Sequence, residues 1–125
     1  MPQSVFVSFD CTHDSELKTA LIRQAGNPDA SCNVAYVSVP GEGPGWLAAT
    51  RARIERSDLL IVLCGPHTDT APGVNAELAM ARDTGIPYFL LAGGPGTSKP
   101  SAAAWTDRVY KWTQDNLKSL IEGQR

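Results

Sequence analysis

The sequence predicts an α/β fold in which helices cover both faces of a parallel sheet. Four short apolar runs start about 25–30 residues apart, which is the length of a strand–helix–strand unit, and helical patterns lie between them. The run LLIVLC shows no polar alternation, as expected of a parallel strand buried on both faces. The four runs are VFVSF (5–9), NVAYVSV (33–39), LLIVLC (59–64) and YFLLA (88–92).

The first two helices follow the first two runs. Asp14 is placed to cap the first helix, Gly26 to end it, and Pro28 lies beyond that end. The apolar residues of this helix are Leu17, Leu21 and Ile22. The second helix is predicted over about residues 46–56. Its inward residues are predicted to be Leu47, Thr50 and Ile54.

The stretch GVNAELAMARDTG (73–85) predicts a third helix. Pro72 fits its first turn, and Gly85 fits its left-handed end before Pro87. Its apolar stripe is formed by Val74, Leu78 and Ala81. Glu77 lies at the edge of that stripe, near the helix start. The helix dipole favours a glutamate there and most such residues are solvated, so the pattern alone allows a structural or a functional interpretation.

The C-terminal part predicts a loop, a strand and a helix. GGPGTSKPSAAA (93–104) is expected to be a flexible loop, and RVYKW (108–112) a short edge strand. Thr113 can cap the last helix. The apolar residues of that helix are Leu117, Leu120 and Ile121.

The bulk composition fits one globular domain over residues 1–125. Hydrophobic residues make up 42% and charged residues 19%, and the net charge is −2. Lysine and arginine are scattered, which argues against nucleic acid as a partner, and no apolar run is long enough to span a membrane. The N-terminus shows no signal-peptide pattern, and three widely spaced cysteines make a poor disulfide framework, so we expect a cytoplasmic protein.

The topology predicts where a site lies. Ligands of open α/β sheets bind at the carboxyl ends of the strands, where the strand order reverses. In a flavodoxin-like order of 2-1-3-4-5, the loops after the first and third strands flank that point. Glu77, one to two turns into the helix after the third strand, can point into the crevice between them.

Two glycine-rich loops suggest phosphate sites but lack the required spacing. GEGPG (41–45) follows the second strand, contains Pro44 and lacks the third glycine of a dinucleotide fingerprint. In GGPGTSK (93–99) the lysine does not follow the glycine, and Pro100 blocks the helix that a P-loop needs.

A metal site is a further alternative, since four soft or borderline ligands lie in the loops after the first and third strands. Their spacing matches no closed zinc site, so we expect no metal. A free cysteine is often a small buried hydrophobe, although a cysteine–histidine nucleophile is also conceivable. The four residues are Cys11, His13, Cys64 and His67.

The chain resembles a known family in the order and spacing of several short motifs. VFVSFD (5–10) followed by Asp14 looks like the first strand of TIR-like domains. Residues 51–87 resemble more specifically the bacterial TIR-like domains of the Thoeris anti-phage defence system, the ThsB group. The matching positions are Arg51, Ile54, Ser57, Asp58, Gly65, Thr68, Val74 and Glu77, and VYKWTQDNLKSLI (109–121) resembles that group's closing segment.

This resemblance implies a flavodoxin-like fold and an enzyme that consumes NAD as substrate, without a further cofactor. Many TIR domains cleave the nicotinamide–ribose bond with one glutamate at the position of Glu77. The resemblance also implies self-association on activation and a cyclic or modified ADP-ribose signal, which acts on a separate effector protein in antiviral defence.

Other residues follow as substrate-binding candidates. Ser8, Phe9 and Asp10 end the first strand and would line the pocket. Trp46 could stack on a base of the substrate, or could equally pack on the sheet. Thr68 is expected to order its own loop through backbone hydrogen bonds.

One carboxylate is chemically sufficient for this reaction, because nicotinamide leaves a pyridinium as a neutral molecule and needs no general acid. A single carboxylate can then stabilise the oxocarbenium-like transition state. Gly73 and Ala76 depart from the family pattern, which has an aromatic residue at the first position and often another at the second. Two other functions stay open: a non-enzymatic TIR-like adaptor, and a nucleoside deoxyribosyltransferase-like enzyme with Glu77 as nucleophile.

Overall fold

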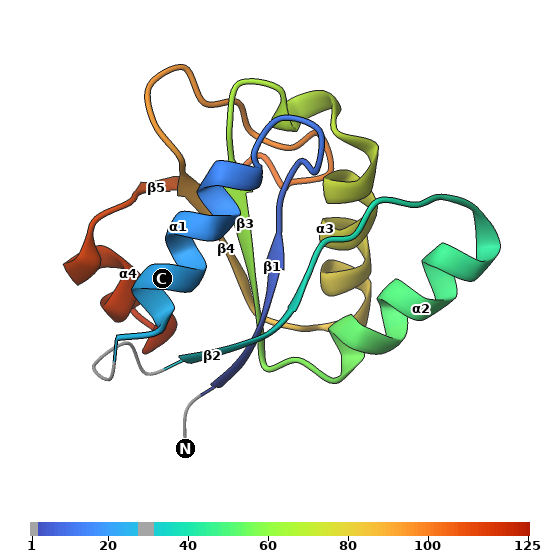
Figure 1. Ribbon diagram of the computed structural model, residues 1–125, viewed down its shortest axis with the longest axis horizontal. Coiled ribbons are helices and arrows are strands. Elements are labelled where there is room, and N and C mark those ends of the chain that lie inside the picture. Colours follow the sequence, from blue (N-terminus) through green and yellow to red (C-terminus); the bar gives the residue numbers. More distant parts are fainter. Residues whose placement is uncertain (1–2, 28–31) are drawn as a thin grey trace.

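The structure of the chain is a computed structural model that describes residues 3–27 and 32–125 (Figure 1). The strands are β1 (Gln3–Ser8), β2 (Cys32–Val37), β3 (Leu59–Cys64), β4 (Tyr88–Ala92) and β5 (Val109–Lys111). The helices are α1 (Ser15–Ala25), α2 (Gly43–Glu55), α3 (Pro72–Thr84) and α4 (Gln114–Ile121), with a short 3₁₀ helix, η2 (Thr68–Thr70), before α3.

The five strands form one sheet in the order β2-β1-β3-β4-β5, and every neighbouring pair is parallel. Both the strand order and the parallel pairing confirm the predictions from the sequence. The central strand β3 is fully buried along its length, as the unbroken apolar run LLIVLC indicated. Strand order reverses between β1 and β3, so the carboxyl ends of these two strands flank the switch point.

Successive residues of a strand point to opposite faces of the sheet, and this divides the core in two. Helices α1 and α4 cover one face, and α2 and α3 lie on the other (Figure 1). The first core is built from Val5, Val7, Leu21, Ile61, Leu63, Leu91, Leu117 and Ile121, among others. The second is built from Phe6, Ile54, Leu60, Val62, Val74, Leu78 and Leu90, among others.

Helix α2 differs from its prediction in its start and in one buried residue. It begins at Gly43, because Pro44 fits the first turn, where its missing N–H has no partner to lose. Thr50 and Ile54 are buried as predicted, but Leu47 is 43% exposed, so its predicted inward position is wrong. The helix extends away from the sheet and packs against α3 (Figure 1). Only one side of α2 is therefore buried, and that side is narrow in its first turns.

Helix ends show one wrong prediction and two correct ones. Asp14 occupies the N-cap position of α1, but its side chain makes no capping hydrogen bond, so the predicted cap is wrong. Thr113 does cap α4, by accepting a hydrogen bond from the backbone N–H of Asn116. Gly85 ends α3 with φ of 77°, in the left-handed region that the sequence predicted. The predicted stop at Pro28 lies outside the described residues.

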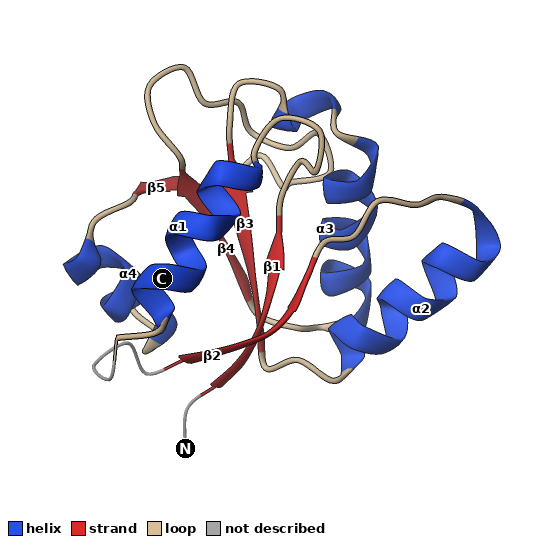
Figure 2. Cartoon of the chain, in the orientation of Figure 1, coloured by secondary structure: helices blue, strands red, loops and turns tan. Residues whose placement is uncertain are grey.

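The loops that follow β1, β3 and β4 gather at the carboxyl edge of the sheet (Figure 2). Strand β1 ends at Ser8 and β2 at Val37, one and two residues before the predicted ends. Phe9 and Ser38 therefore begin loops at this edge. In the part of the chain that the structure describes, no helix has the length and apolar character to cross a membrane.

Candidate active site at the carboxyl edge of the sheet

Glu77 is the most unusual polar residue of this edge. It lies in the second turn of α3 and is only 1% exposed, so it belongs to the buried side of the helix rather than to its margin. Two serine hydroxyls donate to the same carboxyl oxygen, Oε1: Ser8 at 2.7 Å and Ser38 at 2.6 Å. No group in the described ranges forms a hydrogen bond with the other oxygen, Oε2, which is also buried. A buried polar atom without a partner is rare enough to require an explanation.

The pKa of Glu77 is raised from its ordinary value of 4.5 to about 7. Burial is the main cause, because it disfavours the charged form of a carboxyl group. The hydrogen bonds from Ser38 and Ser8 act in the opposite direction, since they stabilise the carboxylate. A pKa of about 7 places the proton exchange of Glu77 near neutral pH, where general acid–base catalysis is most effective.

Glu77 forms part of the wall of a cleft of about 260 Å³. The cleft lies between the loops after β1 and β2 and the start of α3. Its lining residues include Phe9, Asp10, Cys11, Ser38, Val39, Glu42, Trp46 and Val74. Because Glu77 is 1% exposed, its carboxyl group lies under the floor of the cleft rather than in open solvent.

Trp46 forms one side of the cleft and is held by a hydrogen bond from its indole Nε1 to the carbonyl of Val39, 3.0 Å long. Its ring lies against two glycines. A Cβ at Gly41 would meet the ring at 2.1 Å, which no real structure tolerates, and one at Gly73 would lie 3.9 Å away. Trp46 thus occupies the space beside Gly73.

The other predicted site residues fall in different places. Phe9 and Asp10 line the cleft, as does Trp46. Ser8 does not line it, because it is fully buried behind Glu77. Thr68 is also fully buried and lies outside the cleft; its hydroxyl accepts a hydrogen bond from the backbone N–H of Gly65 at 2.8 Å, which is the expected bond within its own loop.

Asp10 is already engaged by its own loop. Its Oδ1 accepts from the backbone N–H of Thr12 at 2.9 Å, and its Oδ2 lies 2.7 Å from Nδ1 of His13. The ring of His13 packs on that of His67, with centroids 4.1 Å apart. Asp10 therefore ties the cleft to a second cluster, which faces a separate cavity of about 240 Å³ on the other side of the loop.

That second cluster contains the buried carboxyl of Asp14, which is 5% exposed and turns away from its own helix. Its Oδ2 has no hydrogen-bond partner among the described residues. Burial and the charge of Asp10 raise its pKa, while His13, His67 and a hydrogen bond with Thr68 lower it. Asp14 thus joins the loops after β1 and β3.

The cysteines do not have the properties of activated nucleophiles. Burial raises the pKa of Cys64 to about 12, and burial together with the charges of Glu77 and Asp10 raises the pKa of Cys11. A reactive cysteine needs a lowered pKa, so these data argue against a cysteine–histidine nucleophile. All three cysteines are free thiols. Within residues 3–27 and 32–125, no group of three or more potential metal ligands comes together.

Ser38 is the residue that reasoning from the sequence missed. It follows β2 directly, as Ser8 ends β1, and β1 and β2 are neighbours in the sheet. Two serines at the carboxyl ends of adjacent parallel strands must lie close together, so this pairing was available as a signal. The predicted second strand continues to residue 39 and therefore places this serine inside an apolar run.

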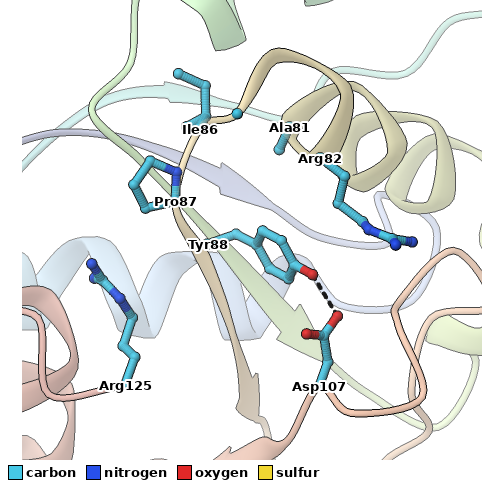
Figure 3. Close-up of a pocket in the computed structure, with 8 residues that line it drawn as sticks. Ala81, Arg82, Ile86, Pro87, Tyr88, Asp107 and Arg125 are labelled. Atoms are coloured by element: carbon cyan, nitrogen blue, oxygen red, sulfur yellow. Dashed lines mark hydrogen bonds between the residues drawn. The ribbon is translucent and has the colours of Figure 1, made fainter.

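A larger pocket of about 490 Å³ lies at the opposite end of α3 (Figure 3). Tyr88 donates to Asp107 Oδ2 there at 2.5 Å, and burial together with Asp107 raises the pKa of Tyr88 to about 12. Arg82 and Arg125 each donate to a backbone carbonyl. These polar groups serve local structure, so we locate the candidate site at Glu77 rather than in this larger pocket.

Comparison with known proteins bears on the fold alone. A diflavin flavoprotein A3 from Nostoc sp. matches 98% of this chain and 88% of its own chain with a TM-score of 0.55, at 15% sequence identity. The fold is flavodoxin-like. No family model matches the sequence, and no curated protein is significantly similar to it.

Proposed function

We propose that this protein is a TIR-like enzyme that cleaves the nicotinamide–ribose bond of NAD, with Glu77 as its catalytic carboxylate. The observation that carries the proposal is the state of Glu77. One of its oxygens is occupied by two serines and the other has no partner in the described chain, at the switch point of the sheet and beside a cleft. The resemblance to Thoeris TIR domains supports the choice of NAD.

The chemistry needs one carboxylate shielded from water. Asp10 is held by Thr12 and His13, and Glu42 is exposed to solvent, whereas Glu77 is buried and keeps one oxygen without a partner among the described residues. The bond between ribose C1′ and the pyridinium nitrogen breaks, and its electron pair neutralises the leaving nicotinamide. The carboxylate of Glu77 stabilises the oxocarbenium-like ribose. Water adds to C1′ and loses a proton; a ribose hydroxyl or adenine in place of water gives a cyclic product.

The burial of Glu77 strengthens this effect and also limits access to it. A charge shielded from water interacts more strongly with a developing cation. A ligand reaches Oε2 only when side chains at the floor of the cleft move, since Glu77 is 1% exposed. We propose that the isolated protein is therefore weakly active and that self-association opens and completes the site.

The size of the cleft supports the same idea. A volume of about 260 Å³ lies below the range of about 300–1,000 Å³ in which pockets enclose drug-sized ligands. It suits the nicotinamide–ribose half of NAD, with Trp46 as a stacking surface. The adenosine half then extends beyond the cleft, where a neighbouring subunit can contact it.

The biological role in this proposal comes from the resemblance. We propose that the protein acts in the cytoplasm as an antiviral sensor whose cyclic or modified ADP-ribose product activates a separate effector. A deoxyribosyltransferase-like enzyme is the second candidate, because a buried glutamate with one free oxygen also suits a nucleophile that attacks a sugar.

The test compares nicotinamide release from NAD by wild type and Glu77→Gln, at protein concentrations that span two decades. Glutamine keeps the size and most hydrogen bonds of the side chain but removes its charge, so we expect a loss of about 10²–10³ in rate. Glu42→Gln is the matched control, because Glu42 lines the same cleft but is exposed; it should retain near wild-type activity.

The outcomes separate the candidate functions. An active wild type with an equally active Glu77→Gln variant contradicts the catalytic role of Glu77. Base exchange on 2′-deoxynucleosides, without release of nicotinamide from NAD, identifies the deoxyribosyltransferase-like alternative. A wild type that assembles but consumes neither substrate, with phage extract present, identifies the adaptor.

A further inference from the structure

We infer that Ser8 and Ser38 are positioning residues, which fix Oε1 of Glu77 and thereby assign Oε2 as the oxygen that meets the ligand. This inference rests on the proposed function for its chemical consequence. The resemblance suggested Ser8 as a substrate-binding residue. The structure instead gives it the role of a support behind the catalytic side chain.

The geometry of the two donors is specific. Ser8 is fully buried and Ser38 is 5% exposed, and both hydroxyls converge on Oε1 rather than on one oxygen each. They come from the ends of adjacent strands, β1 and β2, so the sheet itself fixes their separation. A rigid pair of donors of this kind holds a carboxyl group in one orientation, as a preorganised site requires.

The hydroxyl proton of Ser38 points toward Glu77. Its Oγ accepts a hydrogen bond from the backbone N–H of Phe9 at 3.0 Å, so its own proton must point elsewhere. Two acceptors are within reach: Oε1 of Glu77 at 2.6 Å and the carbonyl of Val7 at 3.5 Å. The short contact with Glu77 is the stronger, because hydrogen bonds to a charged acceptor are shorter and about twice as strong.

The arrangement separates the two carboxyl oxygens by role. Oε1 already accepts two hydrogen bonds, whereas Oε2 accepts none from the described residues. Rotation of the carboxyl by half a turn would exchange the oxygens but break neither serine bond permanently, so the same position in space always holds the oxygen without a partner. The ligand therefore meets an acceptor at one fixed point.

The serines also influence the charge of Glu77. Both hydrogen bonds favour the carboxylate, whereas burial, the larger effect, disfavours it. The titratable groups of the β1–α1 loop that line the same cleft, Asp10 and Cys11, carry no positive charge that could compensate. Loss of either serine should therefore make Glu77 harder to ionise, apart from any effect on packing.

The experiment follows the titration of Glu77 by carboxyl ¹³C NMR in wild type, Ser8→Ala, Ser38→Ala and the double variant, with Glu77→Gln to assign the signal. We expect each alanine to raise the pKa of Glu77 by about one pH unit, and the double variant by about two. In the pH–rate profile of nicotinamide release, the midpoint of the acid limb should move to higher pH by the same amount. Ser8→Cys and Ser38→Cys keep a weaker donor and should raise the pKa less; they also serve if an alanine variant does not fold.

Ser57→Ala is the matched control, since Ser57 is equally buried but donates to the carbonyl of Arg53, far from the site. It should leave the titration of Glu77 unchanged. An unchanged pKa of Glu77 in the serine variants would overturn the inference. If the pKa rises as expected but no variant or wild type releases nicotinamide, the positioning role stands and the proposed function fails instead.

Discussion

Two buried carboxyl groups, Glu77 and Asp14, lie at the carboxyl edge of the sheet and share three properties. Glu77 is 1% exposed and Asp14 is 5% exposed, each has one oxygen without a hydrogen-bond partner in the described chain, and burial raises the pKa of both. Glu77 is held by two serines beside a cleft. Asp14 is held by Thr68 and packs against Gly65.

The difference teaches that a raised pKa and burial do not by themselves identify a catalytic group. Asp14 connects two loops through Thr68, and a second cavity of about 240 Å³ lies beside it. Glu77 is supported only from behind, on the side of the sheet, and it borders the cleft. Changes at Glu77 should therefore alter both the chemistry and the pH dependence of stability, whereas changes around Asp14 should alter stability without altering the chemistry.

The largest effect on stability should come from Glu77→Gln and should depend on pH. The folded protein holds a proton on Glu77 up to a pKa of about 7, whereas the unfolded chain releases it near 4.5. The native state binds more protons in this interval, so the contribution of Glu77 to the stability of wild type is fully present below about pH 4.5 and is lost as pH rises through about 7.

Glutamine does not titrate, so the Glu77→Gln variant lacks this pH dependence. The free energy of unfolding of the variant minus that of wild type should therefore rise by up to roughly 3 kcal/mol between about pH 4 and pH 8. Urea unfolding at several pH values measures it. A difference that stays constant with pH would mean that Glu77 titrates normally, and the comparison with Asp14 would lose its basis.

The next effect should come from Gly65→Ala. A Cβ at this position would lie 2.4 Å from Oδ1 of Asp14, so the carboxyl must be displaced. Overpacking of this kind costs about 2 kcal/mol. Gly45→Ala is the matched control, because a Cβ there meets nothing within 4 Å and alanine favours the helix. Equal stability of the two variants in urea would show that Asp14 is free to move.

The smallest effect should come from Thr68→Val, which removes the hydroxyl between Gly65 and Asp14 at nearly constant volume. A buried backbone N–H then loses its acceptor, and we expect a loss of about 1–2 kcal/mol. Thr50→Val is the matched control, because the hydroxyl of Thr50 is buried without a partner in the described chain, so its removal should be neutral or stabilising. The titration of Glu77 should be the same in both variants; a shift in Thr68→Val alone would mean that the two carboxyl regions are coupled.

The sequence predicted the sheet well because its signals are local and repeated. The apolar run LLIVLC, the spacing of the strands and the turn residues Pro72 and Gly85 each have a direct physical meaning, and together they allow few topologies. The position of Glu77 followed from that topology. Its complete burial did not, because residues from β1 and β2 cover it, and a helical pattern shows only which side of α3 it occupies.

The wrong predictions concern contacts made at a distance in the chain. Asp14 has the right type and position for a cap, but the bond with Thr68 in a distant loop competes for its side chain. Leu47 fits an apolar stripe, but α2 packs on α3 along too narrow a strip to cover it. Ser38 bonds to Glu77, 39 residues further along the chain, and no local pattern predicts a contact over that separation.

The position of Trp46 has an optical consequence. The chain has three tryptophans; Trp105 is 91% exposed, Trp112 bonds to Gln24, and Trp46 forms a wall of the cleft. Replacement of Trp105 and Trp112 by phenylalanine would leave Trp46 as the single tryptophan, so that the fluorescence of the protein reports on the cleft. A pyridinium stacked on the indole accepts an electron from it and quenches its fluorescence. Binding of NAD in the cleft can therefore be measured as quenching, independently of turnover.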